Sequence, residues 1–227
     1  GAFGNSSSAV VLGDALTGNL SPSLYSINAS TIQRPITIDS FVTAGEYKIG
    51  VNDATSCIFS GLITMKQPLS ISAPASGTVI LTNTVNSNGF KLTKMDQGTL
   101  RKATLPLNLS GDFEIKAGDF DAYGMDVSVL GQLTLNGGTY KAGTGLNNIS
   151  GGILQNSGSF IGGSGQVSTS NVNILTGSFT SPTSIIQVSG SWKNNSSFIH
   201  NSGEVIFNGT TSQNITGSSS TLFNNLT

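Results

Sequence analysis

Apolar residues recur along this chain at a nearly constant spacing of about 20 positions. The clearest series is aromatic, and its residue numbers advance by 20, 20, 19 and 19; its members are Phe120, Tyr140, Phe160, Phe179 and Phe198. Glycine, asparagine and serine fill the stretches between them, and no segment shows the 3.6-residue period of an amphipathic helix. A repeat of this length with glycine-rich corners predicts short strands coiled into a stack.

Three further apolar series keep the same step as the aromatic one. One precedes the aromatic residues and contains Phe113 with Ile115, Leu133 with Leu135, Ile153, and Val172 with Ile174. The other two follow the aromatic residues; they contain Met125, Leu146, Val167, Ile186 and Val205, and Val129, Ile149, Thr169, Val188 and Phe207. Each repeat therefore supplies about three apolar clusters, which predicts a triangular parallel β-helix (β-solenoid), an all-β fold with three inward-facing strands per turn.

Residues 1–88 follow the pattern less strictly, at a step nearer 22. Two series show this step: Ile27, Ile49 and Ile71, and Ile36, Ile58 and Ile80. We expect one β-solenoid segment over residues 1–227, with looser turns at a step near 22 in 1–88 and regular turns at a step of 19 to 20 in 89–227. That length predicts ten or eleven turns. The chain begins without Met and ends within the pattern, so we expect it to be a fragment of a larger repeat protein.

Charge is scarce in this chain, which narrows the classes of partner. Only 9% of residues are charged, against about 25% in ordinary domains, and the net charge is −1. This balance gives no electrostatic reason to expect binding to nucleic acid or to anionic lipid. No apolar run approaches the roughly 20 residues of a membrane span, so we expect no membrane insertion by this segment. The only cysteine, Cys57, is expected in the core, with pairing between chains as the alternative.

The few charges follow the repeat. Arg101, Asp121 and Lys141 are spaced by one repeat each and alternate in sign. Lys94 likewise precedes Glu114 by one repeat, and Asp96 precedes Lys116 by the same step. We therefore expect charge ladders on the outer surface, where they would fix the register of neighbouring turns.

Two stretches resemble repeats of bacterial surface proteins. NSNGFKLTKMDQGTLRKA, residues 86–103, resembles the repeat of autotransporter passenger domains, although Met95, Asp96 and Gln97 depart from its usual glycine-containing pattern. The C-terminal stretch, from SGSWKNNSSF to STLFNNLT, is similar to a repeat of very large bacterial surface proteins. This resemblance implies a right-handed parallel β-helix, export to the bacterial cell surface, and a role as a stalk, adhesin or self-assembling coat, without catalytic residues.

A β-helix can also carry an enzyme, whose catalytic groups would be acidic side chains. Asp119 and Asp121 alternate along a predicted strand and could face the same side, as a pair of catalytic carboxylates or a calcium site would require. One repeat later the same positions hold Thr139 and Lys141, which favours a solvated face. These two aspartates are the only metal candidates in the sequence.

Two residue types that occur once each are further candidates for chemistry. His200, the only histidine, lies in SFIHNSGE, where a polar corner residue is expected rather than the base of a nucleophilic site. Trp192, the only tryptophan, could stack on a sugar, but its place in the repeat favours the core.

The sequence as a whole predicts a structural or adhesive β-solenoid of an extracellular bacterial surface protein, not an enzyme and without a cofactor. Its expected partners are neighbouring repeats or identical chains, with host or surface glycans as a further class. The alternative is a carbohydrate-binding or carbohydrate-cleaving β-helix of the lyase or tailspike kind. Loop insertions at one corner over several turns would distinguish that alternative, and the even spacing after residue 111 leaves little room for them.

Overall fold

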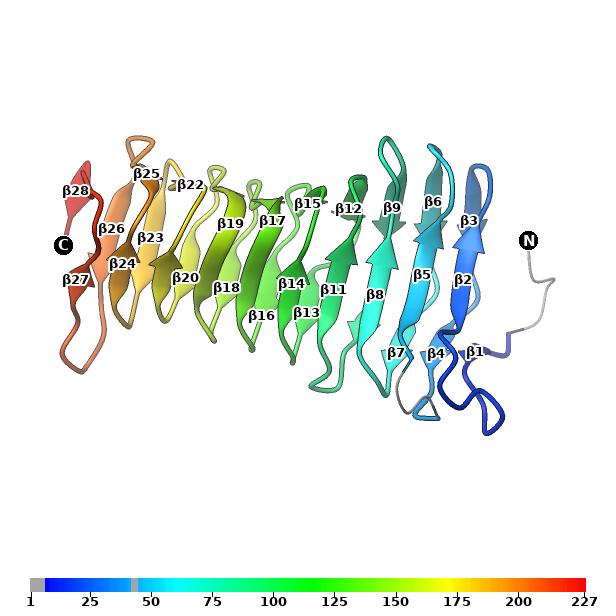
Figure 1. Ribbon diagram of the computed structural model, residues 1–227. Helices are drawn as coiled ribbons and strands as arrows, with labels where there is room; N and C mark the ends of the chain where they lie inside the picture. The colour runs from blue at the N-terminus through cyan, green and yellow to red at the C-terminus, as the bar shows by residue number, and fades with distance from the viewer. Residues whose placement is uncertain (1–6, 42–44) are drawn as a thin grey trace.

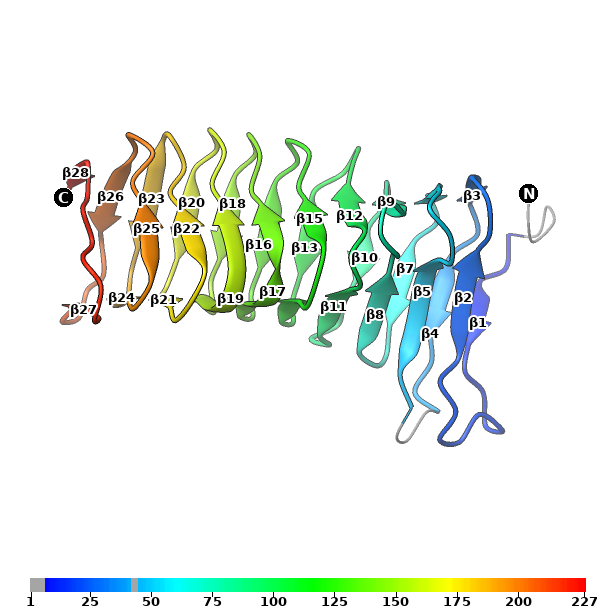
Figure 2. The ribbon, with the colours of Figure 1, turned by 45° about the horizontal axis from the view of Figure 1, so that its top comes forward.

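The computed structural model describes residues 7–41 and 45–227 and forms a parallel β-solenoid of about 9 turns (Figure 1). The described residues contain no helix, so the predicted all-β fold with three strands per turn is confirmed. The number of turns is lower than the ten or eleven expected. The first turn is long, since Ser30 pairs with Cys57, 27 residues later. The longer N-terminal turns reach farther at one corner than the rest (Figure 2).

Face 1 is the first side of each turn and consists of strands that pair in parallel from one turn to the next. Its strands are β2 (Ser23–Ser26), β5 (Tyr47–Val51), β8 (Leu69–Ser72), β11 (Leu92–Met95), β14 (Phe113–Ile115), the first part of β17 (Leu133–Lys141), the first part of β19 (Ile153–Ile161), β21 (Val172–Ile174), β24 (Trp192–Asn194) and β27 (Ile215–Thr216).

Face 2 follows face 1 after a tight corner. Its strands are β3 (Ser30–Ile32), β6 (Ser56–Phe59), β9 (Thr78–Leu81), β12 (Thr99–Lys102), β15 (Asp119–Asp121), the second parts of β17 and β19, β22 (Ser178–Thr180) and β25 (Ser197–Ile199). Because β17 and β19 each run through the corner, with a register shift between Leu135 and Thr139, faces 1 and 2 form one continuous sheet.

Face 3 closes each turn. In the N-terminal part it holds β1 (Val10–Leu12), β4 (Ile36–Ile38), β7 (Ile63–Met65) and β10 (Val85–Asn86). In the remainder it holds β13 (Leu107–Leu109), β16 (Val127–Val129), β18 (Asn147–Ile149), β20 (Val167–Thr169), β23 (Ile185–Val188), β26 (Glu204–Phe207) and β28 (Asn225–Leu226).

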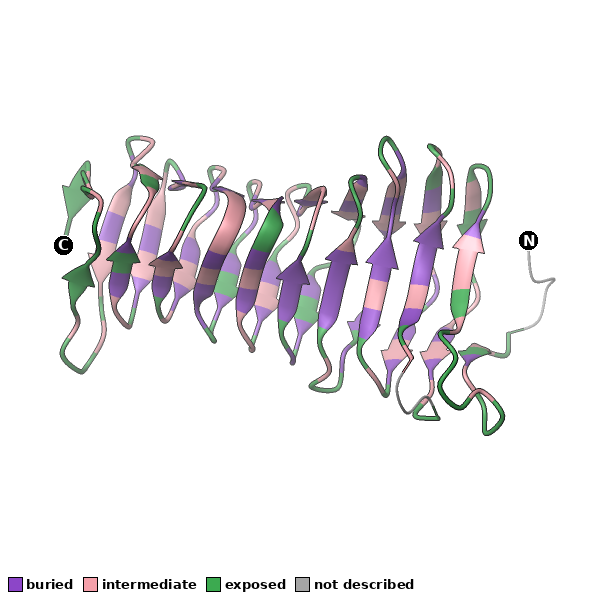
Figure 3. Ribbon diagram, in the orientation of Figure 1, coloured by how far each residue is buried: buried purple, intermediate pink, exposed green. Residues whose placement is uncertain are grey.

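The core is a set of side-chain columns along the solenoid axis, because alternate residues of every strand point inward and partners in successive turns share a position. Burial alternates along the strands accordingly (Figure 3). The series of Val129, Ile149, Thr169, Val188 and Phe207 forms one column of face 3. The other series predicted for face 3 is wrong at its start, since Val167 continues Val127 and Asn147 rather than Met125 and Leu146.

The isoleucine series predicted in residues 1–88 are each wrong at their first member. Ile49 and Ile71 do pair, but the preceding partner is Leu24, and Ile27 is 69% exposed in a turn. Ile58 and Ile80 also pair, yet they lie on the outer side of face 2, whereas Ile36 pairs with Ile63 in the core of face 3. Both errors have one cause: the first turn is longer than the expected step of 22, as the pairing of Leu24 with Ile49 shows.

Glycine shapes the corner between faces 1 and 2. It precedes the face 2 strand in six successive turns, as Gly77, Gly98, Gly118, Gly138, Gly158 and Gly177. At Gly158 the backbone has a φ of +79°, and a Cβ atom there would lie 2.1 Å from the carbonyl oxygen of Gly138. Only glycine allows both this conformation and such close stacking of corner on corner.

Candidate functional surfaces

The aromatic series of the repeat forms one column in face 2, in which the first four members are buried and Phe198 is half-buried. In register, Phe120 is followed by Tyr140, Phe160, Phe179 and Phe198. Ring centroids of successive members lie 5.1, 5.2, 4.4 and 6.2 Å apart, and the planes of Phe160 and Phe179 differ by only 5°. The column thus brings residues that are far apart in sequence into one series of ring contacts, at separations typical of favourable aromatic pairs.

Trp192 belongs to the core at the C-terminal end of this column. It is fully buried in face 1, between Val172 and Ile215, and its ring meets Phe179, Phe198 and Phe223 at centroid distances of 5.8, 5.0 and 5.6 Å. The alternative that it stacks on a sugar is therefore wrong, because no face of the indole reaches the surface.

Tyr140, the one aromatic column member with a hydroxyl, has a buried partner. Its Oη donates to Oδ1 of Asn147 at 2.6 Å. Asn147 Nδ2 in turn donates to the carbonyl oxygens of Ala142 and Gly145, at 3.1 and 2.8 Å. Complete burial raises the pKa of the Tyr140 phenol far above its usual value, so the hydroxyl stays protonated and serves as a donor.

Two lysines lie inside the solenoid, which the charge pattern did not predict. Lys94 is fully buried in face 1; its Nζ donates to the carbonyl oxygens of Met95, of Asp96 at 2.8 Å and of Ala117 at 3.3 Å. Lys102 is 1% exposed in face 2 and donates to Leu81 O and Asn83 O, at 3.3 and 2.6 Å. Burial lowers the pKa of each to about 8.

The column that contains Lys94 uses polar side chains again farther along. It continues through Ile115 and Leu135 to Gln155, then through Ile174 to Asn194. Gln155 Nε2 donates to the carbonyl oxygens of Gly158 and Thr176, at 3.0 and 3.2 Å. Asn194 Nδ2 donates to Ser220 O at 2.9 Å. These side chains therefore supply hydrogen bonds to backbone carbonyls at the corners.

The charge ladder of face 2 has the expected order but a different pattern of contacts. Arg101, Asp121 and Lys141 occupy one register position in successive turns, and Arg101 Nε lies 3.1 Å from Asp121 Oδ2. Lys141 Nζ instead contacts Asp119 Oδ2, at 2.6 Å. The Arg101 guanidinium also lies 4.5 Å from the ring centroid of Tyr123.

The two other expected charge contacts are wrong. Lys94 is in register with Ile115 rather than Glu114, because this turn is one residue longer than the regular step, and its side chain points inward. Glu114 is instead paired with Lys91, at 2.8 Å. For the same reason Asp96 does not meet Lys116: Asp96 Oδ2 bonds the hydroxyl of Ser72, and Lys116 has no ion pair among the described residues.

The remaining candidates for chemistry are dispersed. Asp119 and Asp121 each face a cation of the chain, and the described residues contain no group of three or more histidine, cysteine or acidic side chains able to hold a metal. His200 lies at a corner, where its Nδ1 accepts a hydrogen bond from Ser202 N at 3.0 Å. Cys57 is fully buried, with its Sγ 3.6 Å from Ser30 Oγ.

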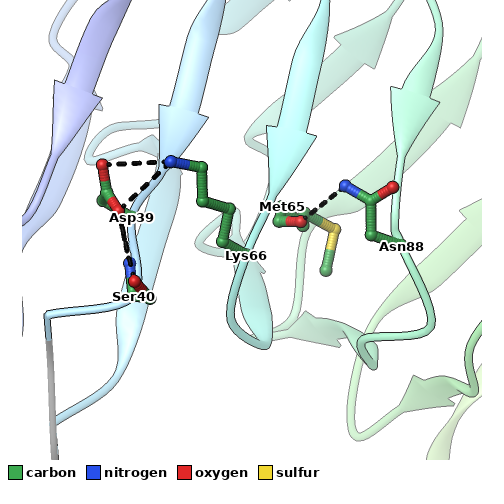
Figure 4. A network of polar contacts seen from close by, with 5 residues as sticks. All are labelled: Asp39, Ser40, Met65, Lys66 and Asn88. Carbon is green, nitrogen blue, oxygen red and sulfur yellow. Dashed lines mark hydrogen bonds and ion pairs between the residues drawn. The ribbon is translucent and has the colours of Figure 1, made fainter.

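Surface polar groups connect adjacent turns at the corners. At the corner that follows face 3, Lys66 Nζ lies 3.4 Å from Asp39 Oδ1, one turn earlier (Figure 4). Asn88 Nδ2 donates to Met65 O at 2.9 Å, so the next turn is joined as well (Figure 4).

An outer column of hydroxyls runs beside the charge ladder. Its members, in register over eight turns with Asp119 as the one exception, are Ser56, Thr78, Thr99, Thr139, Ser159, Ser178 and Ser197. Face 2 therefore presents the same small polar group turn after turn.

One hollow on face 1 combines donors of several kinds. It has a volume of about 320 Å³, lies over β5, β8 and β11, and is lined by Gly45, Glu46, Tyr47, Gln67, Pro68, Ser70, Lys91, Thr93 and Lys116. We call it the face 1 groove. The sequence did not predict it, because its lining residues belong to turns whose register the regular repeat does not give.

Comparison with known proteins adds no assignment. No family model, no curated protein and no solved structure matches the chain. In the part of the chain that the structure describes, no helix is long and apolar enough to cross a membrane.

Proposed function

We propose that this chain is a structural or adhesive segment of a large secreted bacterial surface protein, of the autotransporter-like or giant-adhesin kind that its repeats resemble. It acts by rigid length and by its repeated outer surface, as a stalk, an adhesin or a self-assembling coat. It works at the cell surface, next to further repeats of its parent chain or to identical chains.

The observation that carries this proposal is the unbroken interior. Side-chain columns fill every turn, and the aromatic column alone links five successive turns through ring contacts of 4.4 to 6.2 Å. Each turn is held by its neighbours on both sides, which is how a solenoid maintains a straight, stiff shape. The hydroxyl column adds an outer surface that repeats at the same period.

Carbohydrate cleavage is the weaker candidate. Glycoside hydrolysis needs two carboxylates placed about 5–10 Å apart around the bond to be cut, one of them protonated. Asp119 and Asp121 are both engaged in ion pairs, with Lys141 and Arg101, so neither carboxylate is free to face a substrate. Carbohydrate binding without cleavage is compatible with an adhesive role.

Two measurements on the purified chain test the proposal. Small-angle scattering with negative-stain microscopy should show rods, single or joined end to end and side to side. Incubation with a panel of acidic and neutral polysaccharides should release no new reducing ends. Steady release of reducing ends, lost in Asp119→Asn and kept in Lys193→Gln, would replace the structural proposal with an enzymatic one. Protease treatment of intact cells of the source organism tests the location, since a surface protein is digested and an internal one is protected.

A further inference from the structure

We propose that the face 1 groove binds a carboxylated sugar unit of a glycan. The inference rests on the adhesive role proposed above and assigns to it a site and a class of ligand.

The groove is lined by two hydroxyls that make no hydrogen bond within the described residues. Thr93 and Ser70 are partners in register on β11 and β8, and both line the hollow. Thr93 is only 4% exposed, yet its hydroxyl makes no hydrogen bond within the described residues and is not closed off from the hollow. A buried hydroxyl without a protein partner costs free energy unless a ligand or water meets it.

The rim carries one cation in excess. Among the residues that line the hollow, Lys91 and Lys116 are cations and Glu46 is an anion. Lys91 pairs with Glu114 at 2.8 Å, and Glu46 pairs with Lys48 at 3.1 Å. Lys116 lines the same hollow without an ion pair among the described residues. An anionic group placed there would gain a charge-assisted hydrogen bond, which is roughly twice as strong as a neutral one.

The shape of the hollow and its other lining residues favour a sugar that carries the anionic group. The hollow crosses three strands, which corresponds to about 10 Å at the usual strand spacing. Its length and its volume of about 320 Å³ suit one or two sugar rings. Gln67 supplies an amide, the Ser70 and Thr93 hydroxyls can donate or accept, and Pro68 supplies an apolar wall. A sugar ring presents hydroxyls and apolar C–H groups together, and a carboxylate on it would reach Lys116.

Titration calorimetry with the full chain tests the site. The probes are a tetramer of a hexuronic acid, a neutral hexose tetramer of the same linkage, and a tetra-glutamate peptide. We expect the hexuronic acid tetramer to bind, and we expect affinity for the neutral tetramer to be about tenfold lower, since one charged hydrogen bond is lost. If the tetra-glutamate peptide binds as tightly as the hexuronic acid tetramer, the proposal that the ligand is a sugar is overturned. Binding of none of the probes at millimolar concentration would overturn the whole.

Matched variants locate the binding. Lys116→Gln and Thr93→Val should each weaken binding of the hexuronic acid tetramer by about tenfold. Lys193→Gln, which removes an exposed lysine of the same face far from the groove, should leave it unchanged. Thr93→Val keeps the shape of the side chain, and Ser70→Ala gives a second test if that variant fails to fold. Unchanged affinity in Lys116→Gln and Thr93→Val would refute the groove as the site.

The same samples separate this inference from the proposed function. Each variant is also measured by small-angle scattering. If rods persist while no sugar binds, the groove proposal fails and the structural role stands. If the unmodified chain forms no rods, the proposed function fails whatever the calorimeter shows.

Discussion

Replacing Phe160 by alanine should test whether the aromatic column carries the stability of the regular turns. Phe160 is fully buried in β19, with Tyr140 on one side at 5.2 Å and Phe179 on the other at 4.4 Å, measured between ring centroids. The next residue, Ile161, lies on the outer side of the same strand and is 42% exposed. Ile161→Ala is therefore a matched control in the same turn.

The expected cost follows from what each side chain contacts. Truncating a fully buried phenylalanine to alanine costs about 3–5 kcal/mol, because apolar contacts are lost and a cavity remains. Loss of two stacked neighbours, each worth about 0.5–1.5 kcal/mol beyond burial, places Phe160→Ala at the upper end of that range. Ile161→Ala should cost about 1 kcal/mol or less, as is usual for half-exposed positions.

Urea unfolding followed by tryptophan fluorescence is the direct assay. Trp192 is the only tryptophan, and it lies two turns beyond Phe160, so its signal reports whether the damage is transmitted along the solenoid. With a urea dependence of about 3 kcal/mol per molar, Phe160→Ala should lower the midpoint by more than about 1 M. A midpoint equal to that of Ile161→Ala would refute the idea that the column couples the turns.

Three other substitutions or conditions probe the polar interior and the ladder. Tyr140→Phe should cost about 1–3 kcal/mol in urea unfolding because Asn147 Oδ1 loses its buried donor; an unchanged midpoint would contradict that role. Asp121→Lys should cost about 1 kcal/mol, since an ion pair becomes a like-charge contact. Lys193→Glu, a charge reversal at an exposed residue that has no ion pair among the described residues, should cost less. Equal midpoint shifts would contradict a stabilising role of the ladder. Burial lowers the pKa of Lys94 to about 8, below its unfolded value of about 10.5, so the unfolded chain binds more protons than the folded one between these two pH values. The free energy of unfolding should therefore rise by about 1 kcal/mol or more from pH 7.5 to 9.5, and it should rise less in Lys94→Met. A flat pH profile would contradict the lowered pKa.

The regular part of the fold could be predicted from the sequence because one residue type marks each turn. From Phe120 onward the steps are 20, 20, 19 and 19, and a large aromatic residue has few acceptable positions in a narrow core. Where the step between turns changes, even spacing no longer gives the correct register of the strands. A shift of one residue moves a side chain from the core to the surface, which is why even spacing predicts Lys94 on the outside although it lies inside.

The candidate site could not be predicted for a related reason. Thr93 has nothing unusual in sequence, and its value as a site residue comes from being 4% exposed beneath neighbours of other turns. Likewise, only the three-dimensional pairing shows that Lys91 forms an ion pair with Glu114, whereas Lys116 lines the hollow without an ion pair among the described residues. Such information depends on contacts between turns, and composition and spacing do not contain it.

The position of the groove follows from where the repeat is irregular. In the regular turns the hydroxyl column repeats a small polar group from turn to turn, while the ladder position beside it changes from Arg101 to Asp121 to Lys141. Around the groove the steps of face 1 are unequal, since Tyr47 pairs with Leu69, Leu69 with Leu92, and Leu92 with Phe113. The hollow lies over these turns and is lined by its own set of donors, among them Gln67, Thr93 and Lys116. We therefore expect the regular turns to provide length and stiffness, and the irregular ones to provide selective binding.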